Sequence, residues 1–205
     1  IVSDDLSWFS HIHPEYQADG SYTVTETLPN GGNYVLFADY KPTGSIHQLE
    51  KINITVNGKT APAATYSKDK TAATTNGITL SLIPDGGKFV TNTSMHIKGS
   101  LTQNGKKIDV NSIEDYLGSK AHMVVIGLTD KNFLHVHPEV ENGDFDLHTT
   151  FDKPGVYRGW VQFQKDGKLH TADFVFNVTE GVATDGHAHT HTHEHNMEGK
   201  EGHKH

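Results

Sequence analysis

The chain has 205 residues, of which 34% are hydrophobic, which is enough for one or two small β-rich domains. Its net charge of −8 argues against nucleic acid as a partner, and the lack of a long apolar run argues against a membrane span. It contains no cysteine, which excludes disulfides, thiolate zinc sites and blue-copper sites, but it contains 16 histidines.

The sequence contains an internal repeat. The aligned segments are WFSHIHPE at 8–15 with NFLHVHPE at 132–139, residues 20–40 with 143–163, and GSIH at 44–47 with GKLH at 167–170. A repeat of this length predicts two copies of one structural unit. IVSDDL at 1–6 aligns with IGLTDK inside an apolar run of the second copy, so we expect the first copy to begin in mid-strand. An export signal or lipid anchor would then lie upstream of the sequence given.

Alternation of apolar and polar residues indicates β-strands along the whole chain, whereas helical periodicity is hard to find. The predicted strands are 21–27, 33–40, 51–56, 95–101, 122–129, 145–151, 156–163 and 173–178. Turn signals such as Asn57-Gly58 and Asn104-Gly105 separate them. Short strands at intervals of about ten residues favour an antiparallel sandwich or barrel.

We therefore predict an all-β chain with two tandem immunoglobulin-like antiparallel β-sandwich domains. The first covers 1–57, a Thr/Ala-rich linker covers 58–77, and the second covers 78–181. The tail at 182–205 is rich in histidine and almost free of apolar side chains, so it should be disordered. The first domain carries fewer residues ahead of its His-x-His motif than the second. It should therefore be incomplete at its N-terminus, and its missing edge strands favour a dimer or strand exchange.

A glycine and a tyrosine recur at the same place in both copies, as Gly32-Asn33-Tyr34 and Gly155-Val156-Tyr157. In immunoglobulin-type sandwiches, a tyrosine at such a corner donates a hydrogen bond to a backbone carbonyl a few residues upstream. The recurrence favours this tyrosine corner over an ordinary half-buried strand tyrosine.

The histidines of the repeat have the spacing of metal ligands. Side chains two residues apart on a strand share a face, so each His-x-His motif offers two imidazoles at a strand end. His122 begins the strand that leads into the second motif, and the Gly-x-x-His motif supplies one further histidine per copy. The predicted ligands are His122, His135, His137 and His170 in the second copy and His11, His13 and His47 in the first. His96 and His148 have no counterparts in the first copy, and we interpret both as surface histidines.

Three or four neutral imidazoles suit Zn²⁺ or Cu²⁺. The alternative is that each motif histidine only bonds a nearby carbonyl or lies on the surface. The tail offers a second, weaker kind of site, because alternating histidines bind divalent metals loosely. Its low-affinity candidates are His187, His189, His191, His193, His195, His203 and His205. An expression tag would explain them too, but such tags are usually unbroken runs of histidine.

The segments AHMVVIGLTDKNFLHVHPE and PGVYRGWVQF resemble the extracytoplasmic YtkA-like or FixH-like β-sandwich domains of bacteria. They are also similar to secreted bacterial proteins with an H-x-H-P motif that occur beside heavy-metal efflux or copper-handling components. The resemblance implies an immunoglobulin-type sandwich in the periplasm, secreted, or anchored by lipid to the envelope. Carried over by position, the motif histidines are His122, His135 and His137, with His11 and His13 in the first copy.

These observations favour binding of copper or zinc for buffering, sequestration or delivery to a metal-efflux or uptake component. An adhesion or scaffold module without metal remains the alternative. A three-histidine metalloenzyme is a third interpretation, but neither a general base nor a substrate cleft can be identified in the sequence.

Overall fold

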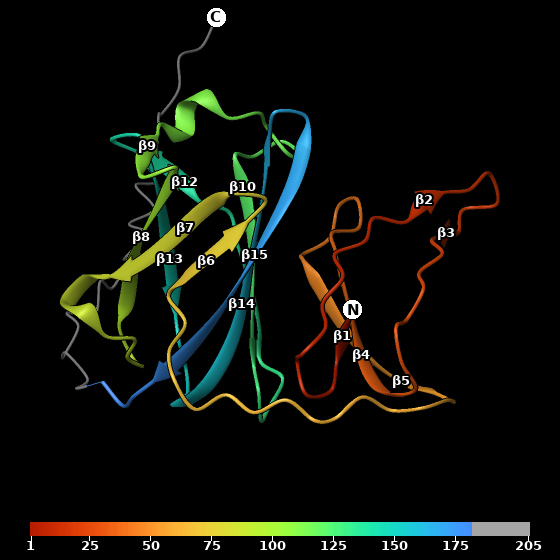
Figure 1. The fold of residues 1–205 in the computed structure, drawn as a ribbon. Helices are drawn as coiled ribbons and strands as arrows, with labels where there is room; N and C mark the ends of the chain where they lie inside the picture. The colour runs from red at the N-terminus through yellow and green to blue at the C-terminus, as the bar shows by residue number, and fades with distance from the viewer. Residues whose placement is uncertain (182–205) are drawn as a thin grey trace, which may run out of the picture.

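The computed structural model describes residues 1–181, so the predicted tail lies outside the described residues. The all-β, antiparallel architecture expected from the sequence is confirmed: three sheets and a small hairpin account for the strands of the described chain. Figure 1 shows the three sheets as successive layers, with the first repeat on the right. In the described residues, no helix has the length and apolar character needed to cross a membrane.

The second repeat forms a two-sheet sandwich. Its central sheet has the order β11-β10-β14-β15, and its outer sheet has the order β12-β13-β8-β7-β6, with β9 beside β8. The strands of the central sheet are β10 (Ala121–Gly127), β11 (Phe133–Val136), β14 (Gly155–Lys165) and β15 (Lys168–Val178). Those of the outer sheet are β6 (Ala72–Thr75), β7 (Ile78–Pro84), β8 (Ser94–Gln103), β9 (Lys106–Ile108), β12 (Glu139–Glu141) and β13 (Asp144–Thr150). Single 3-10 turns lie at Asp85–Gly87 and Val110–Ser112.

Alternate side chains of the two sheets meet in the main core. Ile97 and Phe145 from the outer sheet pack with Met123, Phe163 and Phe176 from the central sheet, and all are buried. Burying a side chain of this size contributes roughly 1.5–3 kcal/mol, so this core carries most of the sandwich's stability.

The first repeat does not form the β-sandwich domain that the sequence predicted for residues 1–57. Its strands β1 (Val2–Ser3), β4 (Gly32–Tyr40) and β5 (Gln48–Val56) form a single sheet, and β2 (Glu15–Tyr16) pairs with β3 (Tyr22–Thr23) in a separate hairpin. A lone sheet must bury its apolar face against another layer. The described residues thus contain one sandwich plus a third sheet, and not two tandem sandwiches.

The sheet of the first repeat covers the outward face of the central sheet. Val2, Leu6 and Val35 form a second core with Val124 and Trp160 of the second repeat. Strand β10 is therefore buried on both faces, and every one of its residues is buried. This explains why its sequence, AHMVVIG, does not alternate and is apolar at every position except His122.

The C-terminal part of the predicted linker belongs to the sandwich, because β6 pairs with β7. The remaining residues, 58–71, lie against both repeats. The amide of Ala64 donates to Asp5 Oδ2 at 2.9 Å, and that of Lys70 donates to the carbonyl of Val175 at 2.9 Å.

The predicted tyrosine-corner hydrogen bond is confirmed in both repeats. Tyr34 Oη donates to the carbonyl of Asn30 at 2.8 Å, and Tyr157 Oη donates to that of Lys153 at 2.9 Å. In both cases the acceptor lies four residues upstream, so the repeated sequence produces a repeated local structure.

Candidate metal centre

Three histidines of the second repeat lie on the outward face of the central sheet. His135 on β11 is the register partner of Val124 on β10, and His122 lies two residues before Val124. Side chains two apart on a strand share a face, as do directly paired residues, so His122 and His135 both face the first repeat. His137 follows the end of β11 by one residue and keeps the same alternation.

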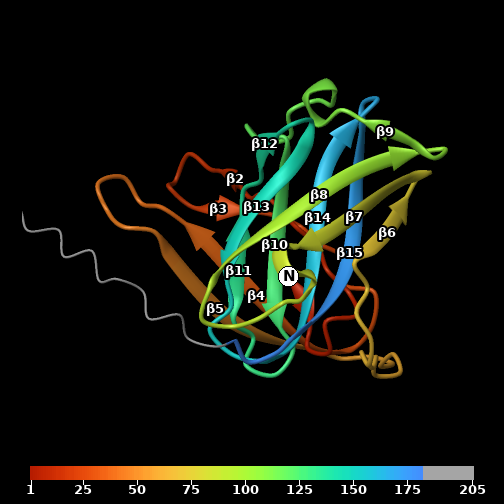
Figure 2. The ribbon, with the colours of Figure 1, turned by 90° about the vertical axis from the view of Figure 1, so that its left-hand side faces the viewer.

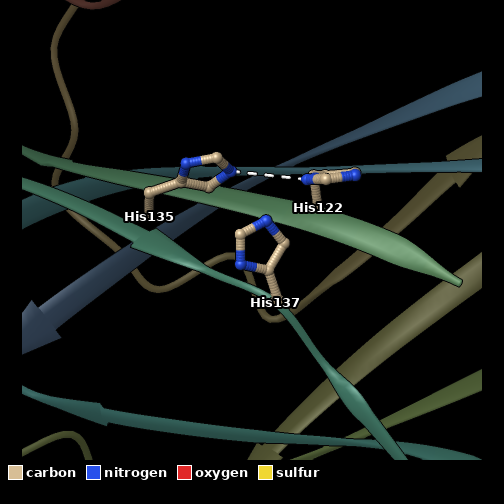
Figure 3. Close-up of side chains that lie close together, drawn as sticks. All are labelled: His122, His135 and His137. Atoms are coloured by element: carbon tan, nitrogen blue, oxygen red, sulfur yellow. Dashed lines mark hydrogen bonds between the residues drawn. The ribbon is translucent and has the colours of Figure 1, made fainter. Parts of the chain in front are cut away.

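The three rings converge. The ring centroids of His122 and His137 are 4.7 Å apart, and those of His135 and His137 are 4.6 Å apart. One nitrogen from each ring lies within 4.8 Å of the others, which is close enough to share an ion. Figure 3 shows the three side chains pointing toward one another.

The first repeat brings its own motif to the same place. The ring of His11 lies 6.1 Å from those of both His122 and His135, and the ring of His13 lies 4.5 Å from that of His11. The motif histidines of the two predicted sites therefore lie in one cluster of five at the junction of the repeats, in which His122, His135 and His137 are the three whose ligand atoms lie within 4.8 Å of one another. This cluster is called the junction site below.

Hydrogen bonds on the far side of two rings determine which nitrogens face the junction site. His122 Nε2 lies 3.0 Å from the carbonyl oxygen of Tyr116, and His135 Nδ1 lies 2.9 Å from Asp39 Oδ2. Both oxygens can only accept, so these two nitrogens carry the hydrogens. In the neutral rings, His122 Nδ1 and His135 Nε2 are left with lone pairs.

These two lone-pair nitrogens face each other at 3.4 Å, along the dashed line in Figure 3. Two lone pairs at this distance repel unless a cation lies between them. Tetrahedral Zn²⁺ with Zn–N bonds of about 2.0–2.1 Å separates its ligand nitrogens by roughly 3.3–3.4 Å. The spacing therefore matches that of two ligands on one ion.

Burial lowers the pKa of three imidazoles of the cluster, those of His11, His122 and His137. The pKa of His11 is lowered to about 4, mainly by burial and also by the neighbouring histidines, although the hydrogen bond that His11 donates to Gln162 raises it. Burial is also the largest cause of the lowered pKa of His122 and His137. Neutral imidazole binds a metal without first releasing a proton, so the lowered pKa of His11, His122 and His137 favours metal ligation.

In each repeat, a polar side chain accepts a hydrogen bond from a motif histidine of the other repeat. Gln162 Nε2 donates to Thr171 Oγ1 at 3.0 Å, so its Oε1 accepts from His11 Nδ1 at 2.7 Å. In the repeat alignment, Gln162 occupies the position of Asp39, which holds His135. Each motif thus meets the equivalent strand of the other copy, as partners do across a two-fold axis.

Aromatic residues at aligned positions also form equivalent contacts between the two repeats. Phe9 stacks on Trp160 with centroids 4.5 Å apart, and its counterpart Phe133 stacks on Phe37 at 4.8 Å. Trp160 and Phe37 occupy aligned positions of the two copies. The junction site therefore lies on a pseudo-two-fold interface whose apolar pairs fix the relative position of the two motifs.

His47 contacts the site only through Asp39. Its Nε2 lies 2.6 Å from Asp39 Oδ1, while the other carboxylate oxygen holds His135. A carboxylate behind a ligand imidazole fixes the orientation of the ring and raises its basicity. The sequence analysis missed Asp39 and Gln162. The signal that could have found them is that Asp39 and Gln162 occupy aligned positions in the two copies of the repeat.

The structure does not bring the predicted ligand His170 to the site. His170 on β15 pairs with Phe163, whose side chain is fully buried between the sheets of the sandwich, and the two rings stack at 5.0 Å. His122 pairs instead with Gln162, the next residue along β14, which faces the first repeat. His170 therefore points to the opposite face of the central sheet, because adjacent strand positions alternate between faces. The predicted tail ligands, from His187 to His205, lie outside the described residues.

A pocket of about 340 Å³ opens beside the junction site. Asp39, His47 and His135 line it, and His148 of the outer sheet lies on its wall. Solvent and ions can therefore reach the outer edge of the His135 ring.

The fold and the five-histidine cluster define a β-sandwich protein with a candidate metal centre on its central sheet. The family described as "Domain of unknown function (DUF8832)" matches residues 73–180, just over half of the chain, and the chain belongs to this family. The matched range contains His122, His135 and His137 but not His11 or His13. No curated protein matches the chain.

Proposed function

We propose that this protein binds a divalent transition metal ion, Zn²⁺ or Cu²⁺, at the junction site. The single observation that carries the proposal is the pair of facing nitrogens, His122 Nδ1 and His135 Nε2, at 3.4 Å. Their outer nitrogens are already fixed by a carbonyl and a carboxylate, as in histidines that ligate metals.

The donor set limits the choice of metal. Among the described residues, the ligand atoms that converge belong to three histidines, and imidazole suits Zn²⁺ and Cu²⁺, whereas Cu⁺ prefers thiolate and thioether ligands. His122, His135 and His137 provide three ligands, and an imidazole from His11 or His13 completes four-coordination. The first repeat thereby becomes part of the coordination sphere.

The proposed role is buffering, sequestration or delivery of the metal to a transport component. Exchange between imidazoles provides the mechanism: the histidines between 187 and 205 capture metal quickly and weakly, and the junction site holds it more firmly. Tethering raises the effective concentration of captured metal near the site.

Titration of the full chain against a chromophoric chelator at pH 7.5 tests the proposal. The wild-type protein should hold one tight ion per chain beyond the weak binding of the tail. The variant His135→Gln/His137→Gln should lose this ion, because two ligands are removed, while His170→Gln, which removes a histidine outside the cluster, should keep it. Unchanged tight binding in the double variant, with circular dichroism showing a folded protein, would refute the proposal.

We further propose that the protein works outside the cytoplasm, as the resemblance to YtkA-like and FixH-like domains suggests. A ligand set without cysteine supports this, because imidazole ligation does not depend on a reducing environment. Fractionation of the native cells tests it, and recovery of the protein with cytoplasmic markers would contradict it.

A further inference from the structure

A second group of metal-ligand side chains lies on the solvent face of the outer sheet. Strands β8 and β13 run side by side there, in the foreground of Figure 2. His96 on β8 is the register partner of His148 on β13, and Asp146 lies two residues before His148 on the same face. The ring centroids of the two histidines are 4.1 Å apart.

The carboxylate of Asp146 faces the histidines instead of a lysine. Its Oδ2 lies 2.7 Å from His148 Nε2. Lys98, the register partner of Asp146, contacts Asp144 Oδ2 at 2.9 Å instead, as Lys107 does at 2.8 Å. Lys98 and Lys107 thus both contact Asp144, whereas Asp146 Oδ2 contacts the imidazole of His148.

One ligand atom each from His96, Asp146 and His148 lies within 4.8 Å of the others. Glu139, the register partner of Asp146 on β12, adds a second negative charge to the same face. Two imidazoles and a carboxylate are a common zinc ligand set, with water able to fill the fourth position. The side chain of His148 is 42% exposed, so an ion reaches it without any opening of the fold.

We propose that His96, Asp146 and His148 form a second binding site for a divalent transition metal, best suited to Zn²⁺. It shares no residue with the junction site and comes from a different sheet. His148 and His135 line the same pocket, so an ion released from the second site has a short route to the junction site. His96 and His148 are exposed, as expected for surface histidines, and the proposal adds a metal-binding role to them.

The site can be tested by NMR on the full chain with ¹⁵N-labelled histidine, titrated with Zn²⁺ at pH 7.5 until the tail is saturated. The imidazole nitrogens of His96 and His148 should shift in a saturable way in the wild-type protein. In His148→Gln, the Zn²⁺ affinity reported by His96 should fall at least about tenfold. The matched control Thr150→Gln places the same side chain one step along the same face and should change nothing.

The variant His122→Gln separates this proposal from the proposed function. It should abolish the Zn²⁺ response of His135 while leaving that of His96 and His148 intact. If neither His96 nor His148 responds to Zn²⁺ in the wild-type protein, or if His96 responds equally in His148→Gln, the second site does not exist. Either result leaves the junction site untouched, because its own resonances report on it separately.

Discussion

At the scale of single residues, the unusual feature of this protein is a group of five neighbouring histidines, three of which, His11, His122 and His137, have a pKa lowered mainly by burial. Five imidazoles share one junction, and in the unfolded chain each would take up a proton near its ordinary pKa. Burial lowers the pKa of His11 from 6.5 to about 4, so the folded protein binds fewer protons than the unfolded chain between these values. Folding without metal therefore becomes less favourable as the pH falls through this window.

This difference predicts a pH-dependent stability of the metal-free protein. The free energy of unfolding should rise from pH 4 to pH 6.5, because the unfolded state carries the additional proton. Urea unfolding at several pH values in the presence of a chelator measures it. In His11→Gln the same rise should be smaller, since one of the titrating groups is gone. An identical pH dependence in both proteins would contradict the assigned cause.

At the scale of elements, the central sheet has to pack on both of its faces. Gly159 on β14 shows how closely the inner face is filled: a Cβ added there would lie 2.6 Å from Cε2 and 3.1 Å from Cζ of the buried Phe176 ring. The aligned residue of the first repeat is Leu36, so the repeat itself does not require glycine at this position. The close approach of the Phe176 ring is what requires glycine at position 159.

We therefore expect Gly159→Ala to destabilise the sandwich by about 1–3 kcal/mol, because Phe176 must leave its position in the core. Urea unfolding of the metal-free protein at pH 7.5 provides the measurement. Thr150→Ala, on the exposed face of β13, serves as the control and should stay within about 0.5 kcal/mol of the wild type. A neutral effect of Gly159→Ala would mean that the core is looser than described.

At the scale of the whole molecule, the junction site joins parts of the chain that are far apart in sequence. The same ion would be held by histidines of both repeats, so metal should stabilise their association as well as the sandwich. A ligand that binds only the folded state at about 100 times its Kd contributes roughly 2.7 kcal/mol. Part of this stabilisation should appear as slower separation of the first repeat from the central sheet.

Limited trypsin digestion can detect this coupling through cleavage after Lys59 and Lys68, two exposed residues of the segment that connects the repeats. Zn²⁺ should slow this cleavage in the wild-type protein. In His11→Gln/His13→Gln the three histidines of the second repeat still bind the ion, but the protection should be lost. Equal protection in both proteins would show that the first repeat does not share the ion.

The sequence alone was sufficient for the properties that depend on local chain geometry. Alternation predicted seven of the eight proposed strands, but it missed β7, and the predicted strand 21–27 is reduced to Tyr22–Thr23. The repeat predicted the tyrosine corner of both copies, and the His-x-His spacing brought His135 and His137 together. These features follow from φ/ψ preferences and the two-residue period of a strand, which act over a few neighbouring residues.

Only the tertiary structure decided which histidines meet. Strand register directs His170 into the sandwich core and His122 toward the first repeat, although both lie on strands predicted to carry ligands. Sheet packing brings the motif histidines of both repeats together and places Asp39 behind His135, 96 residues away in sequence. Register and layer packing depend on the burial of apolar faces from distant segments, such as Val35 against Trp160, and no local pattern in the chain encodes that pairing.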